Sequence, residues 1–321
     1  MSARSARKPE DSFKGTYTAV EVADAIATGV ESAGHTAIRM PVADGGEGTL
    51  DALAGPLGLA RIEVEAVNPW RAPCRGLLGM SPDGTAVVEL ATASGITTPH
   101  DGPRDAVTAD TYGTGMVMAE AARRGARHIV VAAGGSATTD GGAGAIAAID
   151  ERGGLGDTRV TVLSDVTTRY TDAARIFGPQ KGADAAAVAL LTRRLEETAL
   201  TLPRDPREVD GTGAAGGFSG GMWSRFGAEL RSGADFVLDA VGFDDAVRTA
   251  DLVVVGEGRL DGQSRAGKIV SVILARCGDV PVVAVVGSVG DDLGDYRERF
   301  EDVVVASDAE ALTRAGRALR A

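Results

Sequence analysis

Four short loops combine glycine with residue types that handle phosphate groups. They cover residues 44–48, 134–142, 164–165 with the run downstream of it, and 256–268, and each follows a segment predicted to be a strand. Glycine lets backbone N–H groups approach an anion, and the hydroxyls of Ser136, Thr138 and Thr139 can donate to a phosphate or bind a metal. Ligands of open parallel sheets bind beyond the carboxyl ends of the strands. A single such loop is more often an ordinary turn, but four that carry carboxylates and lysines favour a phosphate site.

The same loops contain six carboxylates: Asp44, Glu47, Asp140, Asp165, Glu257 and Asp261. A phosphoryl-transfer site needs a carboxylate to hold Mg²⁺, and another can take the proton from the attacking hydroxyl. Six candidates exceed these roles, so we expect some of them to cap helices or orient loops. Asp44 and Asp165 directly follow predicted strands. We therefore expect these two to matter more than Asp261 for binding Mg²⁺ or for handling the proton.

Lysine is rare in this chain and has an unusual placement. Only four of the 33 basic residues are lysines, and three of them, Lys14, Lys181 and Lys268, are next to a glycine in the sequence. Lysine is a compact point charge on a slim stem, whereas arginine is a planar fork. A phosphate held by a glycine-rich loop often needs the former. The spacing predicts that these lysines contact phosphate groups.

Composition and missing motifs exclude several other classes of protein. The net charge of −12 argues against nucleic acid or anionic membranes as main partners. Cys74 and Cys277 match no metal spacing or disulfide framework, and the histidines show no metal or triad pattern. The sequence contains no Gly-x-Ser-x-Gly elbow, Walker A motif or protein-kinase glycine loop. With a polar start and no apolar run of about 20 residues, we expect a cytoplasmic protein.

Strands and helices alternate along most of the chain. A capping box at Thr18–Glu21 begins a helix that ends near Gly34, and a strand is predicted at residues 37–42. Further strands are predicted at 61–67, 86–90, 128–133, 160–163, 251–255, 280–286 and 302–306, with helices near 115–124, 185–199 and 268–276. This order indicates βαβ units. We expect an α/β protein: a discontinuous flavodoxin- or Rossmann-like parallel-sheet domain of residues 1–60 and 235–321, and an inserted α+β domain of residues 61–234.

Seven motifs occur in an order that closely resembles the bacterial glycerate kinase family: Asp11–Gly15, Ala43–Gly48, Gly134–Thr138, Asp140–Gly142, Phe177–Ala183, Ala214–Gly217 and Gly256–Asp261. The resemblance runs from residue 11 to about residue 290. It implies ATP- and Mg²⁺-dependent phosphorylation of D-glycerate, usually at the 2-hydroxyl, with the site in the cleft between two domains. The expected catalytic residues are Asp44, Asp165, Lys14 and Lys181. The expected substrate- or nucleotide-binding residues are Asp11, Ser12, Gly45, Gly46, Glu47, Gly135, Ser136, Thr138, Asp140, Gln180, Gly256, Glu257, Arg259, Asp261 and Lys268.

The sequence departs from this family in two places. Family members usually carry an apolar strand before the Asp11–Gly15 motif, but residues 3–10 are too polar to form a buried strand. Either the true start lies upstream or that strand is absent. The stretch between Gly142 and Asp165 is also shorter than in many relatives, which suggests a trimmed inserted domain.

These departures leave alternatives open. One is a catalytically impaired protein that binds nucleotide and hydroxy acid without the first strand. Another is phosphorylation at the 3-hydroxyl, because an anchored carboxylate fixes one hydroxyl toward the nucleotide but the sequence does not reveal which. A homo-oligomer is compatible with either alternative.

Overall fold

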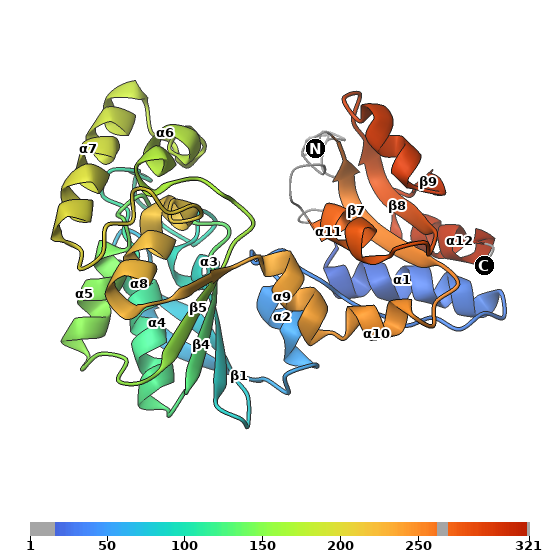
Figure 1. The fold of residues 1–321 in the computed structure, drawn as a ribbon, viewed down its shortest axis with the longest axis horizontal. Helices are drawn as coiled ribbons and strands as arrows, with labels where there is room; N and C mark the ends of the chain where they lie inside the picture. Colours follow the sequence, from blue (N-terminus) through green and yellow to red (C-terminus); the bar gives the residue numbers. More distant parts are fainter. Residues whose placement is uncertain (1–16, 262–268, 320–321) are drawn as a thin grey trace, which may run out of the picture. The chain divides into compact units, whose positions relative to one another are not determined.

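The computed structural model describes residues 17–261 and 269–319, which form two compact units (Figure 1). Of the described residues, the outer unit contains 17–42, 238–261 and 269–319, and the middle unit is Ala43–Val237. Asp11, Ser12, Lys14 and Lys268, which we expected at the site, lie outside the described residues. Residues 43–60, which the sequence assigned to the outer domain, are part of the middle unit.

The middle unit is built on a mixed sheet of six strands in the order β1-β2-β3-β4-β5-β6. Its strands are β1 (Ala60–Val67), β2 (Pro73–Met80), β3 (Thr85–Glu89), β4 (His128–Ala132), β5 (Arg159–Leu163) and β6 (Glu229–Arg231). β1 and β2 form an antiparallel hairpin that pairs with β3, and β3 to β6 are parallel. The carboxyl ends of β3, β4, β5 and β6 therefore meet at one edge of the sheet.

Helices cover this sheet, and α4, α5 and α8 lie side by side along it in Figure 1. The helices of the unit are α2 (Thr49–Ala54), α3 (Leu90–Ser94), α4 (Tyr112–Arg123), α5 (Ala143–Glu151), α6 (Ala173–Phe177), α7 (Ala185–Thr201) and α8 (Phe218–Phe226), with 3-10 turns at Tyr170–Asp172, Pro179–Lys181 and Ala214–Gly217. The main core lies between the sheet and these helices and includes Leu78, Val88, Ile129, Val131 and Phe218. A smaller apolar cluster around Tyr170, Leu191 and Leu195 holds the α6–α7 segment. Small apolar side chains and few aromatics thus suffice for a close-packed core.

The outer unit has a three-stranded parallel sheet in the order β7-β8-β9. Its elements are α1 (Ala19–Ser32), α10 (Phe243–Val247), β7 (Val253–Leu260), α11 (Ile269–Arg276), β8 (Val282–Val289), a 3-10 turn at Gly294–Arg299, β9 (Asp302–Val305) and α12 (Ala309–Ala318). Helix α9 (Gly233–Ala240) runs from the middle unit into this one. Helix α1 begins with the expected capping box, in which Thr18 and Glu21 exchange hydrogen bonds. It packs against α12 and shares an apolar cluster with it.

The strand predicted at residues 37–42 is wrong, because the chain there has no regular structure. Met40 and Val42 pack against the apolar cluster of the outer unit, and Arg39 pairs with Asp24 and Glu31. A strand requires a neighbour for its backbone groups, and within residues 17–261 and 269–319 none pairs with this segment. Apolar character alone therefore made the segment resemble a strand.

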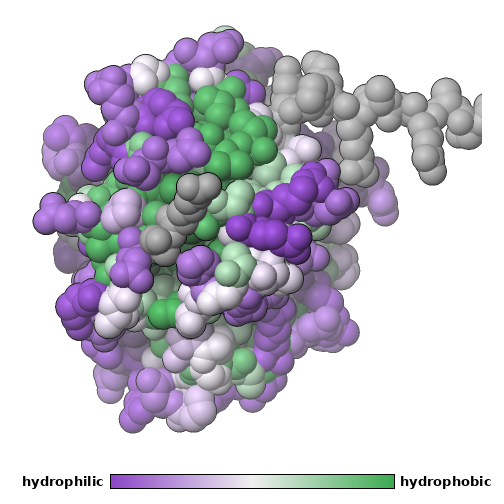
Figure 2. Space-filling view, turned by 90° about the vertical axis from the view of Figure 1, so that its right-hand side faces the viewer, coloured by the Kyte–Doolittle hydropathy of each residue, from purple (hydrophilic) through white to green (hydrophobic). Residues whose placement is uncertain are grey.

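Polar side chains dominate the visible face of the molecule in Figure 2, with a smaller apolar area among them. Among the residues that the structure describes, no helix is long and apolar enough to cross a membrane.

Candidate functional site

Loops from four parts of the chain meet at the carboxyl edge of the parallel strands in the middle unit. Gly134, just after β4, donates its N–H to the carbonyl oxygen of Gly45 at 3.1 Å. A Cβ at Gly134 would lie 2.5 Å from the Cα of Gly46, and one at Gly45 would lie 3.1 Å from the Cβ of Leu163 at the end of β5. Glycine is required because the backbones approach so closely. The 43–48 and 134–142 loops, predicted separately, therefore form one surface.

Asp165 lies at the centre of this edge, directly after β5. Its carboxylate accepts hydrogen bonds from the N–H groups of Gly233 at 2.9 Å and Ala234 at 3.3 Å, at the start of α9. Burial raises the pKa of Asp165 to about 6, and the charge of Asp44 acts in the same direction. The backbone of Asp44 touches the same turn, because a Cβ at Gly233 would lie 2.3 Å from its carbonyl oxygen. Asp44 and Asp165, the two carboxylates that the sequence analysis favoured, thus lie near the same turn.

Glu89 is a buried carboxylate at this edge that the sequence reasoning missed. It ends β3, is 7% exposed, and accepts a hydrogen bond from the N–H of Leu50 at 2.8 Å, in the first turn of α2. Burial raises its pKa, and the nearby exposed Glu47 adds to this effect. Glu89 therefore holds the end of the loop that carries Asp44 and Glu47. Its position at a strand end was visible in the sequence, but it lies in no glycine-rich motif.

The 134–138 turn is tied to the segment after β3. Gly135 accepts a hydrogen bond from the N–H of Ile96 at 2.9 Å, and Ser136 bridges to Gly95. The Ser136 and Thr138 hydroxyls lie 2.9 Å apart, with Thr138 buried and Ser136 half-buried. Gly135 is exposed with φ of +73°, which favours glycine. The turn thus presents Gly135 and the Ser136 hydroxyl at the surface of the site.

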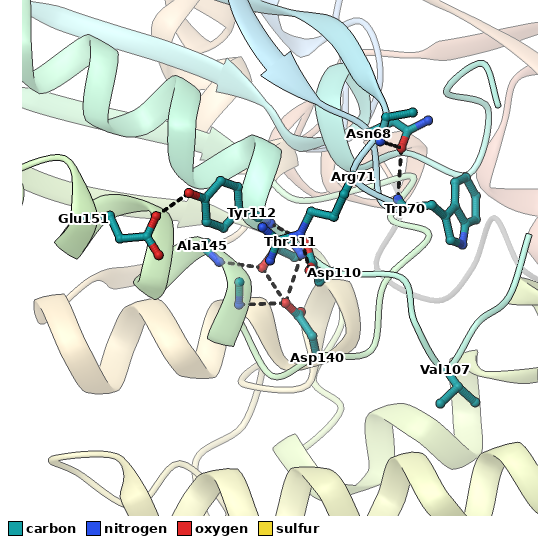
Figure 3. A network of polar contacts seen from close by, with 12 residues as sticks. Asn68, Trp70, Arg71, Val107, Asp110, Thr111, Tyr112, Asp140, Ala145 and Glu151 are labelled. Carbon is teal, nitrogen blue, oxygen red and sulfur yellow. Dashed lines mark hydrogen bonds and ion pairs between the residues drawn. The ribbon is translucent and has the colours of Figure 1, made fainter.

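Asp140, which we expect to bind a ligand, lies in a buried network of hydrogen bonds (Figure 3). Its Oδ2 accepts from the N–H and hydroxyl of Thr111 at 2.9 and 2.8 Å and from Gly144 N–H at 3.0 Å, and its Oδ1 accepts from Gly142 N–H at 3.2 Å. These donors lie at the starts of α4 and α5, where a negative charge is favourable. The contacts assign Asp140 to holding the two helices and the 134–142 loop together.

Two cations from the α6–α7 segment hold the backbone of the same loop. Lys181 is buried, and its Nζ donates to the carbonyl oxygen of Thr138 at 2.6 Å. Arg194 donates to the carbonyl oxygens of Thr139 at 2.7 Å and Val107 at 2.6 Å. Burial lowers the pKa of Lys181 to about 8, although the charge of Asp140 opposes this. Lys181 thus supports the loop from beneath, and the neighbouring Gln180 is exposed.

The Ala214–Gly217 motif packs behind this loop. A Cβ at Gly216 would lie 1.9 Å from the carbonyl oxygen of Thr138, and Gly216 accepts a hydrogen bond from Gly141 N–H at 3.0 Å. Ala215 has a φ of +51°, which is uncommon for a residue with a Cβ. The motif is therefore explained by close backbone packing.

Four expected residues lie in the outer unit, on or just after β7. A Cβ at Gly256 would lie 2.7 Å from Val22 of α1, which explains the glycine by packing. Arg259 pairs with Asp261 at 3.3 Å, and the carboxylate of Glu257 reaches the N–H of Gly258 at 3.2 Å. Because β7 is parallel, Arg259 and Asp261 lie at the carboxyl edge of the outer sheet.

The carboxyl edge of the sheet in the middle unit carries carboxylates that fit a complex of Mg²⁺ with phosphate. No cluster of three metal-ligating side chains occurs among the described residues. Mg²⁺ usually takes one or two protein carboxylates and completes its shell with water and phosphate oxygens. Asp44 and Asp165 fit that requirement, and a carboxylate with a pKa near 6 can also accept a proton at neutral pH.

Comparisons with known proteins identify the family of this chain. The family model described as "Glycerate kinase family" matches residues 9–152 and 150–318. The chain is 36% identical to a glycerate kinase from Bacillus subtilis (strain 168), over 88% of this chain and 84% of the relative. It is 34% identical to glycerate 2-kinase from Escherichia coli (strain K12), over 92% and 88%.

A solved structure shows the same fold. The crystal structure of a Salmonella typhimurium LT2 protein, assigned as a glycerate kinase 2, superposes with a TM-score of 0.82 at 29% identity. The match covers 96% of this chain and 94% of that one. With a family model that spans nearly the whole chain and relatives above 30% identity, this chain belongs to the glycerate kinase family, whose members are kinases that phosphorylate glycerate.

Proposed function

We propose that this kinase transfers the γ-phosphoryl group of ATP to the 2-hydroxyl of D-glycerate and that Mg²⁺ assists the reaction. The observation that carries the proposal is the pair Asp44 and Asp165 at the carboxyl edge of β5. The name of the Escherichia coli relative, glycerate 2-kinase, supports the choice of hydroxyl.

Asp165 is the proposed proton acceptor. Its carboxylate takes the proton of the substrate hydroxyl while that oxygen bonds to the γ-phosphorus. The bond between this phosphorus and the β,γ-bridging oxygen breaks, and ADP leaves with the bond's electron pair. The pKa of about 6 keeps most of the carboxylate deprotonated at pH 7 and still close enough to neutral for effective proton transfer.

The surrounding groups supply position and charge. Asp44 would hold Mg²⁺, which when bound neutralises charge on the phosphates. Gly135 and the Ser136 hydroxyl lie at the surface of the turn and can donate to phosphate oxygens. Lys181 and Asp140 keep that turn in place from the buried side.

The identity of the product shows which hydroxyl of glycerate is phosphorylated. In an assay with enolase alone, 2-phosphoglycerate is converted directly to phosphoenolpyruvate, which absorbs in the ultraviolet. We expect signal from D-glycerate and MgATP without added mutase. Signal that appears only after a mutase is added shows the 3-hydroxyl to be the acceptor, and absence of glycerate-dependent ADP release refutes the reaction itself.

Substitution of the two carboxylates tests their roles. Asp165→Asn keeps the size of the side chain but cannot accept a proton, so we expect kcat to fall by about 100-fold or more. Asp44→Asn should raise the Mg²⁺ concentration needed for half-maximal activity. Near-normal kcat in the first variant and an unchanged Mg²⁺ requirement in the second would remove both assignments.

A further inference from the structure

Arg104 is an exposed arginine in the irregular segment between α3 and α4. Its guanidinium donates to the carbonyl oxygen of Ile96 at 2.6 Å, and the N–H of Ile96 donates to Gly135 at 2.9 Å. Its Cζ lies 6.0 Å from the centre of the Trp70 ring, which stacks on His100 at 4.4 Å. Ile96 therefore links the guanidinium of Arg104 to the 134–138 turn of the site through one hydrogen bond on each side.

The charge of Arg104 differs from that of other cations at this edge because it is not neutralised. Within the described parts of the chain, no carboxylate lies within 4.0 Å of its guanidinium. By contrast, Arg71 pairs with Asp110 at 2.7 Å, and Arg169 pairs with Glu208 at 2.8 Å. Lys181 is buried beneath Thr138, so it presents no charge at the surface.

The substrate requires such a cation. Glycerate is an anion, and the negative charge of Asp165, the proposed proton acceptor, repels it. A guanidinium binds a carboxylate through two parallel hydrogen bonds and so fixes the direction of the molecule. A positive group beside Gly135 would attract the carboxylate of glycerate and leave a hydroxyl of glycerate toward Asp165.

A series of close contacts connects Arg104 to the loop that carries Asp44. Ile96 joins Arg104 to Gly135, and Gly134 touches Gly46, as described above. A Cβ at Gly46 would in turn lie 3.4 Å from Oδ1 of Asp44. A series of contacts within the middle unit thus links Arg104 to Asp44, and the carbonyl oxygen of Asp44 lies against Gly233, whose N–H donates to Asp165.

From this arrangement we propose that Arg104 binds the carboxylate of the acceptor and determines the preference of the enzyme for hydroxy acids. The inference rests on the proposed reaction with glycerate. It assigns a specificity role to a residue outside every glycine-rich motif.

The test is steady-state kinetics of Arg104→Leu with D-glycerate and MgATP. Loss of a charge-assisted hydrogen bond lowers affinity by about 10- to 100-fold, so we expect the KM for glycerate to rise by that factor. The KM for ATP should stay within about twofold, and kcat should change less than the KM for glycerate. Arg104→Lys keeps the charge without the planar fork, and we expect an intermediate KM.

Arg193→Leu is the matched control, because Arg193 is an exposed arginine on α7 and its removal should leave both KM values unchanged. An unchanged KM for glycerate in Arg104→Leu overturns the proposal. A fall in kcat together with an equal rise in the KM for glycerate and in the KM for ATP also overturns it. That pattern would show that Arg104 only holds the loop through Ile96. A wild-type enzyme without glycerate-dependent ADP release refutes the proposed function instead, so the two failures are distinct.

Discussion

The buried amine of Lys181 makes the stability of the middle unit depend on pH in a predictable direction. Lys181 is 9% exposed, and burial lowers its pKa from the ordinary 10.5 to about 8. Between these two values the unfolded chain binds more protons than the folded chain, so stability rises with pH. A difference of about 2.5 in pKa, at about 1.4 kcal/mol for each pH unit, corresponds to about 3 kcal/mol.

Lys181→Met removes the titrating group and keeps an unbranched side chain. We expect the free energy of unfolding of the wild type, minus that of the variant, to increase by about 2 kcal/mol or more between pH 7.5 and pH 10. Taking this difference cancels the contributions of tyrosines and cysteines that titrate in the same range. Lys181→Arg is the control: its guanidinium stays charged throughout, so it should gain nothing from the rise in pH.

Urea unfolding followed by tryptophan fluorescence suits this measurement. Both tryptophans of the chain, Trp70 and Trp223, lie in the middle unit, so the signal reports on the unit that contains Lys181. A difference between wild type and Lys181→Met that stays constant from pH 7.5 to pH 10 would refute the argument. It would mean that the amine has an ordinary pKa and that Lys181 is not held beneath Thr138.

Two further expectations use the same fluorescence assay. Glu89→Ala leaves the N–H of Leu50 without its acceptor and should cost about 1–3 kcal/mol, whereas Glu89→Gln keeps an acceptor and should stay within about 1 kcal/mol of the wild type; equal losses would contradict the capping role. Gly216→Ala should destabilise the unit by more than about 2 kcal/mol because its Cβ would lie 1.9 Å from a carbonyl oxygen. Gly227→Ala has a similar φ of +68° but meets nothing within 4 Å, so it should cost only about 1 kcal/mol, and matching losses would refute the packing explanation.

Buried strands and the loops after them could be predicted because both leave a local pattern. β3, β4 and β5 were expected within about a residue of their observed bounds, and Asp165 was found from its place after β5. β2 was missed because its sequence, Pro73–Met80, contains glycine and proline and no β-branched residue. Its place depends on pairing with β1, which no local pattern reveals.

The roles of site residues were harder to predict than their positions. Asp140 and Lys181 lie in the expected motifs, but their partners, Thr111 and the carbonyl of Thr138, come from distant parts of the chain. Arg104 lies in an irregular segment, and only the contact through Ile96 places it beside Gly135. Residue type and spacing identify which groups can do chemistry. Tertiary contacts decide which of these groups form hydrogen bonds that hold the others in place.

The contact between Asp44 and Gly233 has a consequence for protein engineering. Asp44 is the second residue of the middle unit, and Gly233 lies about one helical turn before its last residue, Val237. The two ends of the segment 43–237 are therefore neighbours. A short linker could join them, with new termini opened at Gly156, where a Cβ would meet nothing within 4 Å. Such a circularly permuted segment would keep both aspartates on one continuous scaffold, free of the rest of the chain.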